Sequence, residues 1–306
     1  MMGSGESIVR SFLCPLQTRR NSWCAFLKVV RPLNCLFVML TTLLGFWYLQ
    51  SFGDIDMVFL SVIAGVSALL IAAGGYVIND FYDYEIDKIN KPNRPLPKGE
   101  ISLRAARAFS IVLLIVGVAL AVFTRNVYCI LVATINSITL FLYARFFKKS
   151  FIAGNIIVSW NACSTFLYGA ILSYNLKNIL PLVCFSFLYT LIREWVKIIE
   201  DYDGDMRQNV KSIAIVLGKN KTVRLLAIPS LVLIVSIAMF SVLGLYSYEL
   251  YAVLSAIIII PLVGFLIRLS KSLNTKTASN IQNYMKLNML SVVLVYALHD
   301  IIIRFF

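Results

Sequence analysis

Most of the side chains that could do chemistry in this sequence lie in two short acidic segments. Nine of the 15 carboxylates fall within residues 79–87 and 193–205, and each segment follows a long apolar stretch. Carboxylate oxygens are the ligands that hard divalent cations prefer, and Mg²⁺ typically takes one or two carboxylates together with substrate phosphates. The two segments therefore predict a Mg²⁺ site that captures a diphosphate.

Helical spacing places the acids of each segment on one side. If the first apolar helix continues into its acidic segment, Asp80, Asp83 and Asp87 share one face, which Asn79 borders. Like charges one turn apart destabilise a helix by about 0.2–0.5 kcal/mol per pair, and ionised groups cost more near hydrocarbon. Such one-sided clusters therefore indicate a bound cation rather than a solvated helix end. The second segment repeats the pattern with Asp201 and Asp205 one turn apart, and with Glu194 and Lys197 on the same stripe.

Basic and polar residues near these acids could bind phosphate oxygens. The proline-rich loop 90–97 is stiff and could lower Arg94 over the site. Lys148 closes a later apolar stretch, and Tyr143 lies one turn before it. For each residue alone, anchoring at the membrane surface explains the charge as well as phosphate binding does. We favour Arg94 and Lys148 as phosphate ligands, with Arg31 next.

The elements that must position these side chains are membrane-spanning helices. The chain is 59% apolar and only 14% charged, with a mean hydropathy of +0.82, whereas soluble domains carry about 25% charged residues. A span needs about 20 apolar residues, and nine such stretches leave no room for a soluble domain. We predict an N-terminal segment over 1–27, without a cleavable signal peptide, and a nine-helix domain over 28–306. The stretches begin near Leu33, Met57, Arg104, Val127, Phe151, Ile179, Leu225, Glu249 and Tyr284.

The distribution of basic residues orients the spans. With the N-terminus in the cytoplasm, all of the 28 lysines and arginines except Arg125, Lys177 and Arg304 fall on the inner side. The positive-inside rule predicts this bias, so the net charge of +13 does not call for a nucleic-acid partner. Both acidic segments and the two long loops, 79–103 and 200–222, then face the cytoplasm, and the C-terminus lies outside. The six scattered cysteines and the lone His299 give no metal or acid–base pattern, and a structural role for His299 is favoured.

Together the motifs resemble a known family. Asn79-Asp80-x-x-Asp83-x-x-x-Asp87, followed by Asn93-Arg94-Pro95-x-Pro97, is similar to the first signature of the UbiA superfamily of intramembrane prenyltransferases. Asp201-x-x-x-Asp205, followed by Lys211-Ser212, is similar to the second. The resemblance implies an all-α, polytopic fold of nine helices around a central cavity, capped by the cytoplasmic loops. It also implies Mg²⁺-dependent ionisation of a prenyl diphosphate, with the tail in an apolar tunnel open to membrane lipid.

The resemblance assigns roles to individual residues. The expected catalytic residues are Asp80, Asp83, Asp87, Asp201 and Asp205. The expected metal ligands are Asn79, Asp83, Asp87, Asp201 and Asp205. The expected substrate-binding residues are Arg31, Asn34, Asn79, Arg94, Tyr143, Arg145, Lys148, Lys197 and Lys211.

The acceptor is less closely defined. Arg31-Pro32-x-Asn34-Cys35 and Arg193-Glu194-x-x-Lys197 resemble the superfamily branch of archaeal digeranylgeranylglyceryl phosphate synthases. That branch implies transfer of a geranylgeranyl group to the free hydroxyl of geranylgeranylglyceryl phosphate. An aromatic acceptor of the menaquinone or ubiquinone type is the alternative.

Two other classes of membrane protein fit the sequence less well. A transporter would place its acids near the midplane, and a CDP-alcohol phosphotransferase needs a D-G-x-x-A-R run that is absent. The prenyl length, any general base and the oligomeric state are not indicated.

Overall fold

The computed structural model describes residues 23–49, 55–148, 150–207 and 211–305, and all the regular structure within them is helical. Eight helices are long and apolar enough to cross a membrane; α2 becomes a ninth when the helix Trp23–Val29, which meets it at a 51° bend, is included. The predicted polytopic all-α fold is therefore confirmed, and the first 22 residues of the predicted N-terminal segment lie outside the described residues. The spans are α2 (Pro32–Trp47), α3 (Ile55–Tyr82), α5 (Leu103–Val122), α6 with the π-helical turn η1 (Val127–Phe147), α7 (Ala153–Leu172), α8 (Leu176–Glu200), α11 (Lys219–Val242), α12–η2–α13 (Tyr248–Lys271) and α14 (Thr275–Phe305).

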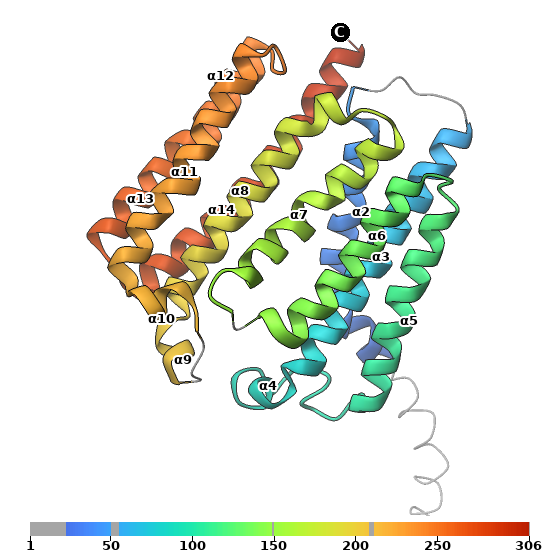
Figure 1. The fold of residues 1–306 in the computed structure, drawn as a ribbon, viewed down its shortest axis with the longest axis vertical. Helices are drawn as coiled ribbons and strands as arrows, with labels where there is room; N and C mark the ends of the chain where they lie inside the picture. The colour runs from blue at the N-terminus through green and yellow to red at the C-terminus, as the bar shows by residue number, and fades with distance from the viewer. Residues whose placement is uncertain (1–22, 50–54, 149, 208–210, 306) are drawn as a thin grey trace, which may run out of the picture.

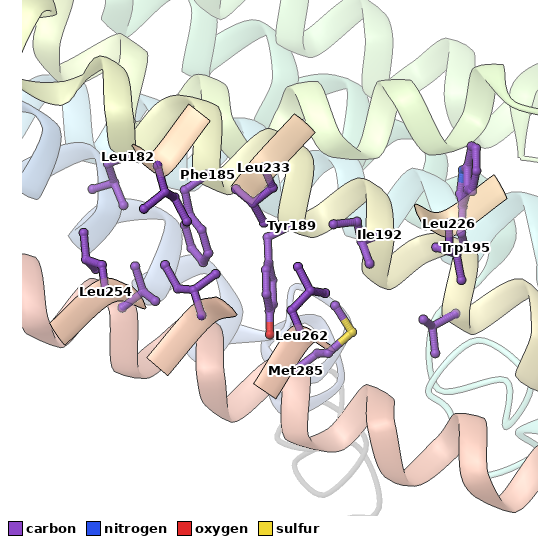
Figure 2. Packing of buried hydrophobic residues seen from close by; sticks show 14 of the residues in the cluster. Leu182, Phe185, Tyr189, Ile192, Trp195, Leu226, Leu233, Leu254, Leu262 and Met285 are labelled. Carbon is purple, nitrogen blue, oxygen red and sulfur yellow. The ribbon is translucent and has the colours of Figure 1, made fainter. Parts of the chain in front are cut away.

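Helix α8 joins the two halves of the bundle. It packs on α7 of the first half and on α11 and α14 of the second (Figure 1). Its apolar face carries Leu182, Phe185 and Tyr189 into a core that also contains Leu233 and Met285 (Figure 2). Because α8 ends in the second acidic segment, this packing fixes where those acids stand.

The last helix returns to the first. The Tyr48 hydroxyl lies 3.2 Å from Nδ1 of His299, and the backbone N–H of Leu49 donates to Asp300 at 2.5 Å. These contacts join the end of α2 to α14, so the helices close on themselves. The lone histidine therefore has a structural place, as expected. The central cavity that the family resemblance implies stays a prediction.

Helix α3, which carries the first acidic segment, is held against α5 by small residues. The Ser67 hydroxyl donates to the Gly117 carbonyl at 2.7 Å, and the Ser110 hydroxyl donates to the Gly74 carbonyl at 2.8 Å. A Cβ at Gly74 would stand only 3.0 Å from the Ser110 carbonyl oxygen. Such close backbone approach through small residues is typical of helix packing in membranes, and it fixes the position of the α3 end.

Both acidic segments lie at one end of the bundle. Helix α3 leads into α4 (Tyr84–Asn90), and α8 leads through Asp201 into α9 (Tyr202–Arg207), which is followed by α10 (Ile213–Leu217). Figure 1 shows α4 and α9 at the same end of the molecule, opposite the C-terminus. The structure thus brings the two segments to a common face, as the sequence predicts.

Candidate active site

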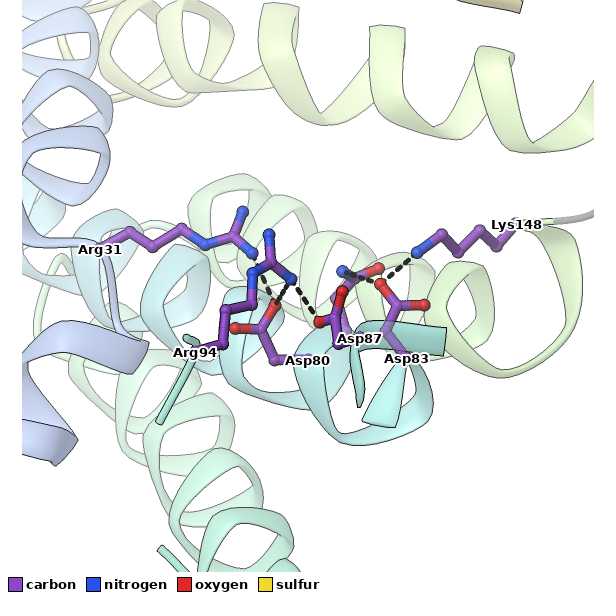
Figure 3. Close-up of polar contacts among 7 residues, drawn as sticks. Arg31, Asp80, Asp83, Asp87, Arg94 and Lys148 are labelled. Carbon is purple, nitrogen blue, oxygen red and sulfur yellow. Dashed lines mark hydrogen bonds and ion pairs between the residues drawn. The ribbon is translucent and has the colours of Figure 1, made fainter. Parts of the chain in front are cut away.

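The three aspartates of the first segment stay on one side because helical hydrogen bonding runs through the junction of α3 and α4. The N–H of Asp83 donates to the Asn79 carbonyl at 2.9 Å, and that of Asp87 donates to the Asp83 carbonyl at 2.8 Å. The residues Asp80, Asp83 and Asp87 are 4%, 7% and 4% exposed. Burial of three carboxylates requires positive partners, and the structure supplies them from three other segments (Figure 3).

Two arginines contact Asp80, and one of them also contacts Asp87. Nη2 of Arg31 lies 2.6 Å from Oδ1 of Asp80. Nη1 of Arg94 lies 3.0 Å from the same oxygen and 2.6 Å from Oδ2 of Asp87. The loop that carries Arg94 is a series of turns anchored by the buried Leu96. The expectation that this loop lowers Arg94 over the site agrees with the structure.

The third cation reaches the cluster through a π-helical turn. In η1 (Tyr143–Phe147), the N–H of Lys148 donates to the carbonyl of Tyr143, five residues earlier, at 2.9 Å. Single π-turns often occur at functional sites, and here residues five apart stack on the same face. The ammonium of Lys148 contacts Asp83, whose Oδ2 also accepts from the Asn79 amide at 2.9 Å.

The same turn directs Arg145 elsewhere. Its guanidinium lies 4.8 Å from the ring centroid of its neighbour Phe146, and the residue is exposed. Tyr143, by contrast, is partly buried and lies within electrostatic reach of Asp83 and Glu194. Of the polar residues predicted on this stretch, the structure therefore brings Tyr143 and Lys148 to the carboxylates and points Arg145 at an aromatic ring.

Arg31 stands at the elbow before α2 in an unusual backbone conformation. Its φ of 55° and ψ of 67° lie in the left-handed region, which non-glycine residues adopt at a cost and which often marks functional sites. The guanidinium also lies 5.0 Å from the Tyr76 ring centroid. Asn34 lies beside the Tyr76 hydroxyl, so both predicted residues of this elbow face α3.

The second acidic segment starts inside α8 and continues past the end of that helix. Asp201 caps the helix, its N–H donating to the Lys197 carbonyl at 2.8 Å. Although Asp201 is exposed, protein atoms around it desolvate the carboxylate and raise its pKa above the ordinary value, and Lys197 opposes that rise. Lys211 is exposed. The side chain of Asp205 lies outside the described residues, so its metal-binding role stays a prediction.

Lys91 is a residue that the sequence reasoning did not assign to the site. Desolvation and the nearby Arg94 lower the pKa of Lys91, Asp87 opposes this, and Lys197 adds to it. Lys91 also acts on the carboxylate of Asp201, so it lies within electrostatic reach of both acidic segments. Its spacing of four residues from Asp87, whose carbonyl accepts its N–H at 2.9 Å, is the signal that could have identified it.

The residues present fit a hard divalent cation. Among the residues that the structure describes, no three His, Cys, Asp or Glu side chains meet as a preformed metal site. Two carboxylates, however, already converge on one cationic atom, Nη1 of Arg94. The donor set consists of carboxylate and amide oxygens, which suits Mg²⁺ with substrate phosphates completing its coordination. Acids beside guanidinium and ammonium groups can bind a metal diphosphate and stabilise the charge that develops on it.

Comparison with known proteins agrees with this geometry. The UbiA prenyltransferase family matches residues 38–291. The digeranylgeranylglyceryl phosphate synthase of Saccharolobus solfataricus is 35% identical over 283 residues, covering 90% of this chain and 96% of that protein. The enzyme of the same name from Sulfurisphaera tokodaii is 35% identical over 278 residues, covering 90% of this chain and 97% of its own length.

Solved structures show the same fold. A structure of digeranylgeranylglyceryl phosphate synthase superposes with a TM-score of 0.80 at 31% identity, over 92% of this chain and 99% of that one. A UbiA homologue from Archaeoglobus fulgidus, bound to GPP and Mg²⁺, superposes with a TM-score of 0.68 at 19% identity, over 89% of this chain and 99% of its own.

Proposed function

Because the chain belongs to the UbiA prenyltransferase family, we propose that it transfers a geranylgeranyl group from its diphosphate to the free hydroxyl of geranylgeranylglyceryl phosphate. The observation that carries this proposal is 35% identity to digeranylgeranylglyceryl phosphate synthases across nine-tenths of the chain. The site supports it, since buried aspartates with basic partners suit a diphosphate and a metal. The chain is in any case a multi-pass membrane enzyme that transfers prenyl groups.

The bonds exchanged define what the site must do. The C1–O bond of the prenyl diphosphate breaks and leaves its electron pair on the diphosphate. The acceptor hydroxyl oxygen then forms an ether bond to C1 and releases its proton. Negative charge thus develops on the leaving diphosphate as C1 becomes positive. Side chains that stabilise the charge on the diphosphate accelerate the step.

The acidic, basic and apolar residues around the site have different roles in this reaction. Asp83, Asp87 and Asp201, with Asn79 and Asp205, would hold Mg²⁺, which supplies Lewis-acid stabilisation of the diphosphate when bound. Arg31, Arg94 and Lys148 already stand against the carboxylates and can turn to the phosphate oxygens. Apolar helices around the site would keep water from the allylic cation, which water converts to a prenyl alcohol.

The orientation of the protein belongs to the proposal. The charge bias of the sequence favours an N-terminus and both acidic segments at the cytoplasmic face of the cell membrane, with the C-terminus outside. In this orientation the diphosphate would enter the site from the cytoplasmic side.

An acceptor panel tests the function. Purified protein in lipid nanodiscs receives radiolabelled geranylgeranyl diphosphate with geranylgeranylglyceryl phosphate, a hydroxybenzoate or a dihydroxynaphthoate, with Mg²⁺ or with EDTA. We expect a labelled ether lipid from the glyceryl phosphate alone, and only with Mg²⁺. Transfer to an aromatic acceptor in preference, or full turnover in EDTA with metal content verified, would contradict the proposal.

A further inference from the structure

The first residues of the second acidic segment, Arg193 and Glu194, lie deeper in the bundle than Asp201. Arg193 and Glu194 belong to α8, and Arg193 precedes Asp201 by eight residues, or about 12 Å along a helix at 1.5 Å per residue. Nη2 of Arg193 lies 2.6 Å from Oε1 of Glu194, with side-chain exposures of 21% and 10%. Ionised residues inside a membrane-spanning helix are costly, and by default they mark a functional site.

This pair lies within electrostatic reach of residues beside the first acidic cluster. The Tyr143 hydroxyl lies within electrostatic reach of Arg193, Glu194 and Asp83. The Tyr76 hydroxyl lies within reach of Arg193, and also of Arg31 and Asn34. Polar residues of α3, η1, α8 and the α2 elbow therefore gather in one part of the bundle, and Tyr76 lies one helical turn before Asp80 on α3.

The guanidinium of Arg193 retains unused binding capacity. It has five N–H donors in a rigid fork, and its ion pair with Glu194 runs through a single nitrogen, Nη2. Its Nε is buried without a hydrogen-bond partner. A buried donor without a partner destabilises the protein, and a planar guanidinium matches a phosphate group in particular. The side chain is 21% exposed, so an anion can approach Arg193 and use N–H donors that Glu194 leaves free.

We propose that Arg193, held in place by Glu194, binds the phosphate of the lipid acceptor. This inference rests on the proposed function and assigns a residue to its acceptor. The donor diphosphate belongs at the helix ends, where Asp83, Asp87 and Asp201 stand. A phosphate bound at Arg193 is separate from that position, and the short glycerol backbone lets its free hydroxyl point toward the prenyl C1. Glu194 is a positioning residue, because it acts through Arg193.

The test measures KM separately for the two substrates. The variants are Arg193→Gln, Arg193→Lys and Glu194→Gln, with Arg104→Gln as the matched control, since Arg104 is an exposed arginine of α5. Loss of a hydrogen-bonded phosphate contact typically weakens binding about tenfold to a hundredfold. We expect Arg193→Gln to raise KM for geranylgeranylglyceryl phosphate by that factor and to leave KM for geranylgeranyl diphosphate within twofold. Arg193→Lys should recover part of the loss, and Arg104→Gln should behave as wild type.

A phosphate-free acceptor, geranylgeranylglycerol, separates binding from structure. If Arg193 binds the phosphate, wild type and Arg193→Gln should use this acceptor with equal kcat/KM. An equal loss with both acceptors, or a rise in KM for the diphosphate instead, overturns the proposal. Should Arg193→Gln fail to fold, as judged by loss of Mg²⁺-dependent thermal stabilisation by geranylgeranyl diphosphate, the Arg193→Lys data decide by the same comparison. Failure of the proposed function is distinct, because wild type would then not turn over the glyceryl phosphate at all.

Discussion

Replacing Asp83 by asparagine separates the contribution of this residue to catalysis from its contribution to the stability of the fold. The change is nearly isosteric, and it removes the charge that Lys148 contacts. Asn79 can still donate its amide to the new side-chain oxygen, as it does to Oδ2 now at 2.9 Å. Any large effect on rate therefore reports the lost carboxylate charge and not a lost shape.

The two expected effects differ in size. A metal-bridged contact to the leaving group is worth several kcal/mol, and each 1.36 kcal/mol is a factor of ten in rate, so kcat/KM should fall about a hundredfold or more. Stability should fall less. The side chains of Asp83 and Lys148 are 10% and 35% exposed; exposed pairs are worth about 0.2–1 kcal/mol and broken buried pairs cost about 3–5 kcal/mol. A partly solvated pair lies between, at about 1–2 kcal/mol.

The assay compares steady-state prenyl transfer with thermal unfolding, in Mg²⁺ and in EDTA, for Asp83→Asn, Asp201→Asn and Asp56→Asn. Asp56 is an exposed acid in the first turn of α3, at the opposite end from the site, and serves as the control. We expect the first two variants to lose activity and the third to keep it. If Asp83→Asn retains activity within a few fold of Asp56→Asn, the active-site assignment is wrong.

Three further predictions follow from the geometry. Desolvation raises the pKa of Asp201, so its ionised form is penalised in the folded state. The metal-free Asp201→Asn variant should therefore melt higher than wild type at neutral pH and lose that advantage as pH falls below the raised pKa; an unchanged difference across the titration would refute this. Lys91→Gln removes a cation that lies within electrostatic reach of Asp87 and Asp201 and should raise KM for the prenyl diphosphate more than KM for the acceptor; equal rises in the two KM values would exclude Lys91 from the donor site. Gly169→Ala places a Cβ against the carbonyl oxygen of Thr42 on α2. Such overpacking costs about 1–3 kcal/mol, so the melting temperature in nanodiscs should fall. An unchanged melting temperature would refute the tight contact between α2 and α7.

Local features of the site were predictable because they depend on short spacings. The acids at 80, 83 and 87 share a side through helical periodicity alone, and the prolines around Arg94 specify a turn-rich loop that folds back over the preceding helix. The nine spans follow from the lengths of the apolar stretches. The last span begins at Thr275 and not near Tyr284, because polar residues continue a helix that hydropathy alone does not detect.

Other features depend on contacts that no spacing rule gives. Arg31 reaches Asp80 across 49 positions, and only the packing of α2 against α3 makes that pairing possible. The π-turn brings Lys148 to Asp83 and directs Arg145 to the ring of Phe146, whereas the sequence, although it favours Lys148, also places Arg145 among the expected substrate-binding residues. Lys91 comes within electrostatic reach of Asp201, which is 110 positions later in the sequence.

The pairing of charges explains how the site can exist beside hydrocarbon before substrate arrives. Three buried aspartates meet three cationic side chains, Arg31, Arg94 and Lys148, so the first cluster carries no uncompensated charge. Mg²⁺ and a diphosphate bring opposite charges of their own, and the acids can turn to the metal while the basic groups turn to the phosphates. Each group would then exchange one oppositely charged partner for another, and the protein would avoid the several kcal/mol that an unpaired buried ion costs. On release of the diphosphate, Arg31 and Lys148 would return to Asp80 and Asp83, and Arg94 to both Asp80 and Asp87.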